Sequence, residues 1–190
     1  MGQVLRSDRL TLRPWRLDDA EAALAVFGDP EVSRWLSPAL EQVGDLSTMR
    51  VLLQQWMLED ARASDPAGRW AIELASDQRV VGGVVLLQLP PGGEDLEIGW
   101  QLAPEFWGRG LAAEAGHLVA HWALEQESVD EVFAVVRPAN VRGAATAKRI
   151  GMEWVGESEK YYGLRLHVYR LRAADLDRPL PGQTQVTHHR

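Results

Sequence analysis

The chain of 190 residues contains no cysteine. This absence excludes disulfides, thiolate metal sites and a catalytic thiol, and it fits a protein that works in a reducing cytoplasm. The sequence also lacks any run that approaches the roughly 18 apolar residues needed to span a membrane. Its opening, MGQVLRSDRL, lacks the apolar stretch of a signal peptide. We therefore expect a cytoplasmic protein without a membrane partner.

Basic residues are fewer than acidic residues in this chain. Lysine and arginine number 20 against 27 acidic residues, for a net charge of −7. Nucleic-acid binding relies on clustered cations that face phosphates, so we expect no nucleic-acid partner. A 46% hydrophobic and 25% charged composition is that of an ordinary globular protein long enough to bury a core. We expect one domain over residues 1–175 and a flexible tail over 176–190.

Hydrophobic periodicity divides the chain into strands and helices. Alternation with period two predicts a first strand in RLTLRPW and then an antiparallel meander of RWAIELA, VVGGVVLLQL and LEIGWQLA. EVFAVV predicts another strand, and two more are expected around Gly163. Helical spacing predicts helices in DLSTMRVLLQQWMLEDARA, over 111–126 and in NVRGAATAKRI. Asn140 is the expected cap of the last helix, and Gly151 is its expected end.

Two glycines, Gly108 and Gly110, stand directly before the alanine-rich helix in EFWGRGLAAEAG. Glycine permits positive φ and lets a ligand approach the main chain, because it has no Cβ. Amides at a helix N-terminus and the positive end of its dipole favour an anion, and Arg109 adds a cation. The turn therefore predicts either a phosphate-binding nest or a tight turn that binds nothing, and both interpretations stay open.

The same stretch raises a rival interpretation. Gly108, Gly110 and Ala113 satisfy G-x-G-x-x-A, and Asp130 follows about 20 residues later, as in dinucleotide-binding folds. However, the residues APEFW separate the strand from Gly108, whereas the turn of a dinucleotide-binding fold follows its strand almost directly. Asp130 lies before the next strand, whereas the acid that binds the ribose lies at the far end of that strand. A dinucleotide-binding protein is kept as an alternative.

The histidines of HLVAH are one helical turn apart but lack a third ligand, so no metal site is expected.

Three stretches taken in order resemble a known family. LEIGWQLAPEFWGRGLAAEA and then VVRPANVRGAATAKRIGMEWVGE resemble the GNAT superfamily of acetyl-CoA-dependent N-acetyltransferases. RLTLRPWRLDDAEAA resembles the first strand and helix of the branch that contains the ribosomal-protein N-terminal acetyltransferases. The resemblance implies an α/β (α+β) fold with one mixed, mostly antiparallel sheet of six to seven strands and helices on both faces. The strands at 96–102 and 131–136 are implied to run parallel and to splay apart.

The resemblance also implies that coenzyme A lies in the notch between these two strands. Its diphosphate would rest on the amides of the glycine turn, and its pantetheine arm would bond to the strand edge. The implied cofactor-binding residues are Trp100, Gln101, Leu102, Trp107, Gly108, Arg109, Gly110, Leu111, Ala112, Ala113, Asn140, Gly143, Ala147 and Arg149. One position departs from the family, because the serine proposed in relatives to protonate the leaving thiolate is Gly143 here.

The implied activity is transfer of an acetyl group from acetyl-CoA to a primary amine within a ternary complex. A carboxylate would accept the amine proton. Glu159, near the place where relatives of this branch carry a catalytic glutamate, is preferred to Glu97, which alternates with apolar Ile98 and can face solvent. Tyr161 and Tyr162 are candidates by residue type for the proton donor that the missing serine would supply.

Other expectations concern the acceptor and the assembly. Trp35 and Trp70 are candidate walls of the acceptor pocket, and the acceptor is either a protein N-terminus or a small-molecule amine. A homodimer is implied by the family likeness alone. A non-catalytic acyl-CoA-binding or sensor module is the alternative from another functional class, since Gly143 would be consistent with lost chemistry.

Overall fold

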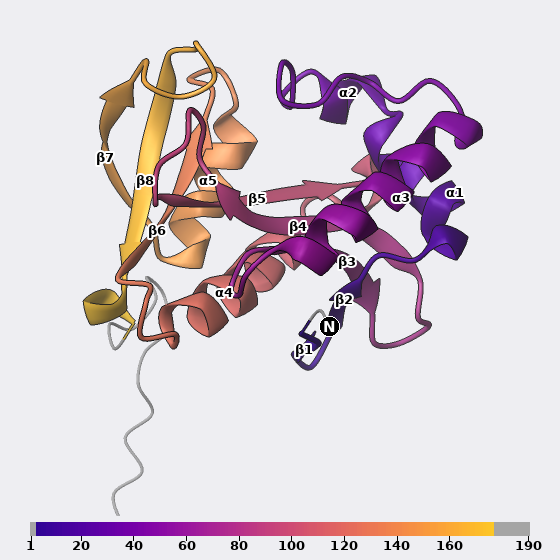
Figure 1. The fold of residues 1–190 in the computed structure, drawn as a ribbon, viewed down its shortest axis with the longest axis horizontal. Coiled ribbons are helices and arrows are strands. Elements are labelled where there is room, and N and C mark those ends of the chain that lie inside the picture. The colour runs from indigo at the N-terminus through magenta and orange to yellow at the C-terminus, as the bar shows by residue number, and fades with distance from the viewer. Residues whose placement is uncertain (1–2, 177–190) are drawn as a thin grey trace, which may run out of the picture.

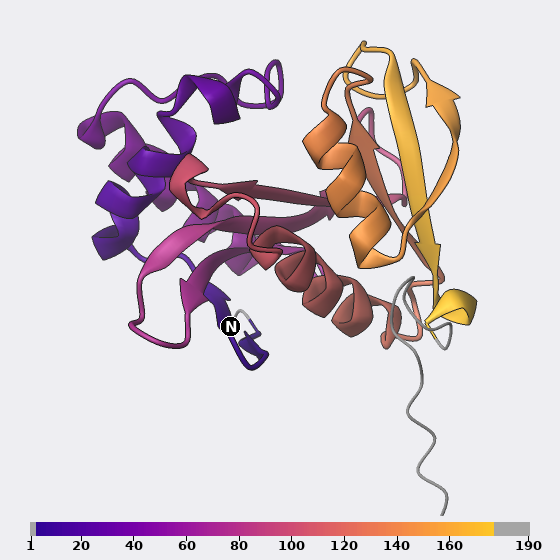
Figure 2. The same ribbon diagram turned by 180° about the vertical axis from the view of Figure 1, so that it is seen from behind.

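The computed structural model describes residues 3–176, and strands from this part of the chain form one sheet with helices on both faces (Figures 1 and 2). The strand order is β1-β2-β3-β4-β5-β6-β8-β7. The strands are β1 Leu5–Arg6, β2 Leu10–Pro14, β3 Gly68–Leu74, β4 Val80–Gln88, β5 Leu96–Leu102, β6 Glu131–Val136, β7 Glu153–Ser158 and β8 Leu166–Arg172. The α-helices are α1 Ala20–Phe27, α2 Pro30–Ser33, α3 Leu46–Arg62, α4 Leu111–Leu124 and α5 Val141–Ile150.

The expected mixed, mostly antiparallel architecture is confirmed, but the sheet has eight strands rather than six or seven. The additional strand, β1, spans only two residues, which is too short to show an alternating pattern. No helix within residues 3–176 is long and apolar enough to cross a membrane. Nearly all of the expected tail over 176–190 lies outside the described residues.

The parallel pair of β5 and β6 is the open point of the sheet. Glu97 opposite Phe133 is their single register pair, and Figure 1 shows β6 turning away from β5. β5 pairs with β4 from Gln88 opposite Leu96 to Gly82 opposite Leu102, so only its other edge is left free. Dinucleotide-binding folds need a sheet of mostly parallel strands, which this sheet excludes. The rival interpretation of the glycine turn is therefore wrong.

Different helices cover the two faces of the sheet. On one face, Trp15, Phe27 and Trp56 form an aromatic cluster with ring centroids 5.1 to 6.2 Å apart. Gly83 of β4 leaves room for it, because a Cβ there would lie 2.9 Å from Trp15 Cζ2. On the other face lie α4 and α5, which Figure 2 shows side by side. These packed rings bury large apolar areas and fix the layers on either side of the notch.

A buried ion pair network ties β2, β3 and the start of α1 together. Arg13 donates to both carboxylate oxygens of Asp19, at 2.8 and 2.9 Å, and through Nε to Glu73 at 2.7 Å. The hydrogen bond to Asp19, and secondarily the one to Glu73, raise the pKa of the guanidinium above its usual value. Loss of one partner from such a pair costs about 3–5 kcal/mol. The network holds the segment that carries Trp15 against the sheet.

Candidate active site

The turn between β5 and α4 uses the left-handed backbone that its glycines permit. Gly108 has φ +76° and Gly110 has φ +75°, a region that costs other residues roughly 1–2 kcal/mol. Gly110 precedes the first residue of α4, and no side chain caps this helix. Among the described residues, the amides of 108–113 donate to no protein acceptor. Free amides at the positive end of a helix dipole form an anion site.

Arg9, from the turn between β1 and β2, supports this loop. Its Nη1 donates to the carbonyl of Arg109 at 3.0 Å, and its Nε donates to Glu114 at 2.7 Å. Ser7 Oγ donates to the other oxygen of Glu114 at 2.5 Å. The sequence analysis missed Arg9 because it lies 100 positions from the carbonyl that it contacts. No local pattern could have revealed this contact.

A cavity of about 90 Å³ lies between the α2 region, the end of β5 and the N-termini of α4 and α5, and it adjoins the glycine turn through Trp107 and Ala112, although residues 108–111 are not in its walls. Its walls include seven of the predicted cofactor-binding residues: Trp100, Gln101, Leu102, Trp107, Ala112, Asn140 and Gly143. The guanidinium of Arg142 stacks 3.6 Å from the ring centroid of Trp107, whose Nε1 donates to the Leu102 carbonyl at 2.9 Å. Ala147 is buried in the core and Arg149 is exposed, and neither lines this cavity.

Asn140 and Gly143 meet at the start of α5. Asn140 Oδ1 accepts a hydrogen bond from the Gly143 amide at 2.9 Å, which confirms Asn140 as the helix cap. A Cβ on residue 143 would lie 2.7 Å from Asn140 Nδ2 and 3.0 Å from Val136 Cγ1. Glycine therefore lets the asparagine side chain lie against the helix. A side chain on residue 143 would force the asparagine to shift.

A second cavity, of about 270 Å³, lies on the face of the sheet that α1 and α3 cover, and it reaches the notch. Its walls include the aromatic residues Trp15, Phe27, Trp35, Trp56, Trp100 and Tyr162, and the charged residues Arg69, Glu97 and Arg137. Trp35 lines both cavities. Trp70 lies on the α4 face, where its ring meets Trp122 at 5.6 Å and its Nε1 donates to the Gln3 carbonyl. Of the two predicted pocket walls, Trp35 lines these two cavities and Trp70 lines neither.

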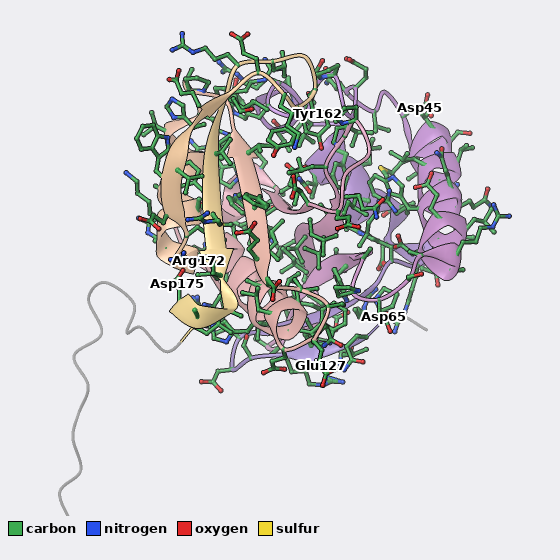
Figure 3. The ribbon with its side chains drawn as sticks, turned by 60° about the vertical axis from the view of Figure 1, so that its left-hand side comes forward. Asp45, Asp65, Glu127, Tyr162, Arg172 and Asp175 are labelled. Atoms are coloured by element: carbon green, nitrogen blue, oxygen red, sulfur yellow. The ribbon has the colours of Figure 1, made fainter. Side chains whose placement is uncertain are left out.

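Glu97 and Tyr162 form a hydrogen-bonded pair in the larger cavity. Tyr162, in the segment between β7 and β8 (Figure 3), donates from its hydroxyl to Glu97 Oε2 at 2.6 Å. Burial raises the pKa of Glu97 to about 7, although the Tyr162 bond lowers it. Burial and the charge of Glu97 raise the pKa of Tyr162, so the phenol keeps its proton. Tyr162 has φ +56°, a strained value of the kind that gathers at functional sites.

The other two predicted catalytic residues lie elsewhere. Glu159 is exposed and lines neither cavity. Tyr161 is buried, with its hydroxyl donating to Asp95 at 3.4 Å and its ring packed with Leu89 and Leu166. The structure thus brings Glu97 and Tyr162 to the cavity and leaves the preferred glutamate outside it.

The two histidines of α4 lie one above the other. The rings of His117 and His121 are 3.9 Å apart, and burial, with the charge of His117 second, lowers the pKa of His121. Within residues 3–176 no group of three or more histidine and carboxylate side chains could hold a metal ion.

The sheet opens near a helix N-terminus whose amides have no acceptor among the described residues, and this arrangement is that of an acyl-CoA-dependent acetyltransferase. Residues 9–153 match the model of the acetyltransferase (GNAT) domain, and the chain belongs to this family. The chain is 26% identical to the N-acetyltransferase p20 of Bacillus licheniformis over 170 residues, which cover 88% of this chain and 93% of p20.

Solved structures show the same fold. An acetyltransferase from Agrobacterium tumefaciens strain C58 has a TM-score of 0.73 at 26% identity, over 90% of this chain and 95% of that one. The microcin C7 self-immunity acetyltransferase MccE, solved in complex with acetyl-CoA and AMP, has a TM-score of 0.71 at 20% identity, over 87% of this chain and 93% of MccE. The fold of these acetyltransferases thus extends over most of the present chain.

Proposed function

We propose that this acetyltransferase transfers an acetyl group to a primary amine by direct attack in a ternary complex, with Glu97 as the general base. The observation that carries the proposal is the 2.6 Å hydrogen bond between Tyr162 and Glu97 in the larger cavity. Glu97 also marks the position where β5 and β6 begin to part. A carboxyl group whose pKa is raised to about 7 is suited to accept a proton near neutral pH.

The glycine turn and the smaller cavity fit the coenzyme A part of acetyl-CoA. The amides of 108–113 have no acceptor among the described residues and would hold the diphosphate. A Cβ on Gly108 would meet no atom within 4 Å, so the main chain is open to a ligand there. Trp100 and Asn140 would flank the pantetheine arm along the free edge of β5. The acetyl-CoA bound to the structural neighbour MccE supports this choice of ligand.

Acetyl-CoA supplies the activated thioester, and the residues of this chain move the proton. The amine nitrogen bonds to the acetyl carbon as the carbon–sulfur bond breaks, and Glu97 accepts the amine proton. Tyr162 replaces the serine that is Gly143 here and donates a proton to the sulfur. Tyr162 then regains a proton from Glu97 along their 2.6 Å hydrogen bond, so that both residues return to their starting states.

The first test compares Glu97→Gln with Glu159→Gln, because both remove a carboxylate but only Glu97 lines the cavity. We expect Glu97→Gln to lower kcat by about 10²–10⁴-fold with unchanged affinity for acetyl-CoA. Glu159→Gln should keep the wild-type rate. Release of free CoA thiol with a panel of amines measures kcat, and calorimetry measures the affinity. A wild-type rate in Glu97→Gln together with a loss in Glu159→Gln would move the role to Glu159.

Two narrower assignments rest on the resemblance of the sequence to its family. Membership of the ribosomal-protein branch stays a prediction, and so does the homodimer. Peptides with the N-termini of ribosomal proteins belong in the amine panel for this reason.

A further inference from the structure

The larger cavity contains two guanidinium groups in different electrostatic surroundings. Arg69 is neutralised by Glu59 and Asp60, at 2.8 and 2.6 Å. Arg137, directly after β6, has no carboxylate partner among residues 3–176. Its Nη2 donates to the Ser37 carbonyl, and its Nε is buried without a hydrogen-bond partner. The Nε has no exposed surface, so an acceptor in the cavity would meet the terminal Nη donors that the Ser37 carbonyl does not use.

Arg170 shows what is distinctive about Arg137. Arg170 has an equally buried and unpartnered Nε, but it lies on β8 and its Nη1 faces Glu131 at 3.8 Å. It lines neither of the two cavities described above. Of these two arginines, only Arg137 therefore presents an uncompensated positive charge to a cavity.

The anion that fits Arg137 is not the diphosphate of coenzyme A. Arg137 lines only the larger cavity, whereas the smaller one adjoins the glycine turn through Ala112 and has Arg142 in its wall. Along the parallel pair, Glu97 lies opposite Phe133 at the closed end, and Arg137 follows β6 at the open end. The cavity therefore offers a proton acceptor and a cation at different ends.

We propose that Arg137 binds a carboxylate of the acceptor, and that the acceptor is a small amine with one carboxylate and an apolar or aromatic side chain, such as an amino acid. This inference rests on the proposed function, because it assumes that the amine meets Glu97. A planar guanidinium matches a carboxylate with two parallel hydrogen bonds. Trp15, Phe27 and Trp35 supply apolar walls, and about 270 Å³ suits a small molecule. A single uncompensated cation balances one negative charge rather than the two of a phosphate.

The test uses the full chain, acetyl-CoA and a panel of apolar and aromatic L-amino acids with their carboxamides. Thiol release gives kcat and KM for each acid and its amide. We expect the wild type to prefer the acid at least about tenfold in kcat/KM, because hydrogen bonds between charged groups are lost with the amide. Arg137→Gln should remove this preference by raising KM for the acids and should leave KM for acetyl-CoA unchanged. Arg170→Gln, the matched control outside the cavity, should keep the preference.

Other outcomes would overturn the proposal. If Arg137→Gln lowers turnover of acids and amides equally, then Arg137 only holds the segment of Ser37 across the cavity. A wild type that prefers amides or uncharged amines also contradicts the proposal. If no amine is acetylated, the proposed function fails, and calorimetry with the CoA complex then decides this inference separately. Binding of the acids that Arg137→Gln abolishes supports it, and no binding refutes it.

Discussion

The two cavities of this acetyltransferase are built from different parts of the chain. The smaller cavity adjoins the glycine turn between β5 and α4, and the anion site proposed there consists of consecutive main-chain amides in the conformation that Gly108 and Gly110 permit. The larger cavity needs residues from α1, residues 35–40, α3, β3 to β6, the start of α5 and the segment before β8. A backbone site is specified by consecutive residues, whereas a side-chain site exists only after distant elements have packed. The two should therefore respond differently to single substitutions.

The largest effect expected on ligand binding separates the charge of the backbone site from its shape. Ala112, in the first turn of α4, lines the smaller cavity. Ala112→Glu should keep the helix stable, because a carboxylate near a helix N-terminus is favourable. The same carboxylate would face the diphosphate, so we expect acetyl-CoA to bind about 10²–10³-fold more weakly. Calorimetry measures this loss, and Ala112→Gln should lose much less. Equal losses would mean that the added size, rather than the charge, closes the site.

The next effect belongs to the side-chain site. The role proposed for Glu97 as general base needs its ionised form, so kcat/KM should rise with pH around the Glu97 pKa of about 7. Tyr162→Phe removes the hydrogen bond that lowers this pKa, so the rise should move to higher pH. We also expect kcat to fall about 10²-fold, since the proposed proton donor is lost. The pH dependence of kcat/KM measures the shift, and the rate at saturating substrate measures the fall in kcat.

Tyr161→Phe is the matched control for Tyr162→Phe. The Tyr161 hydroxyl donates to Asp95 outside the cavity, so this variant should keep the wild-type pH profile. If Tyr162→Phe keeps that profile as well, the pair does not act in the reaction.

The features that the sequence predicts are those specified by neighbouring residues, and the features that it misses are built from distant elements. The sequence predicts the strand at 131–136, and it predicts the following helix together with its caps, Asn140 and Gly151, because these signals are local. The glycine turn was found for the same reason. Arg9 could not be found, because only folding brings it to the carbonyl of Arg109.

The choice between two glutamates shows where sequence reasoning stops. The alternating pattern of β5 correctly places Glu97 and Ile98 on opposite faces of the strand, and Ile98 is buried on its face. It cannot show that the face of Glu97 is covered by the segment around Trp35 and by Tyr162 rather than by solvent. Burial from distant elements raises the pKa of Glu97, and Glu159 receives no such cover.

The smallest expected effect tests the contact that both cavities share, because Asn140 and Gly143 line each of them. Gly143→Ser restores the serine of the family but places a Cβ 2.7 Å from Asn140 Nδ2, so the asparagine must leave its capping position. Loss of such a cap costs about 1 kcal/mol, and we expect the free energy of unfolding in urea to fall by about that amount. In an Asn140→Ala background the same substitution should cost less, because the colliding side chain is gone. If the two changes add without coupling, Asn140 and residue 143 do not compete for space, and packing does not explain the glycine.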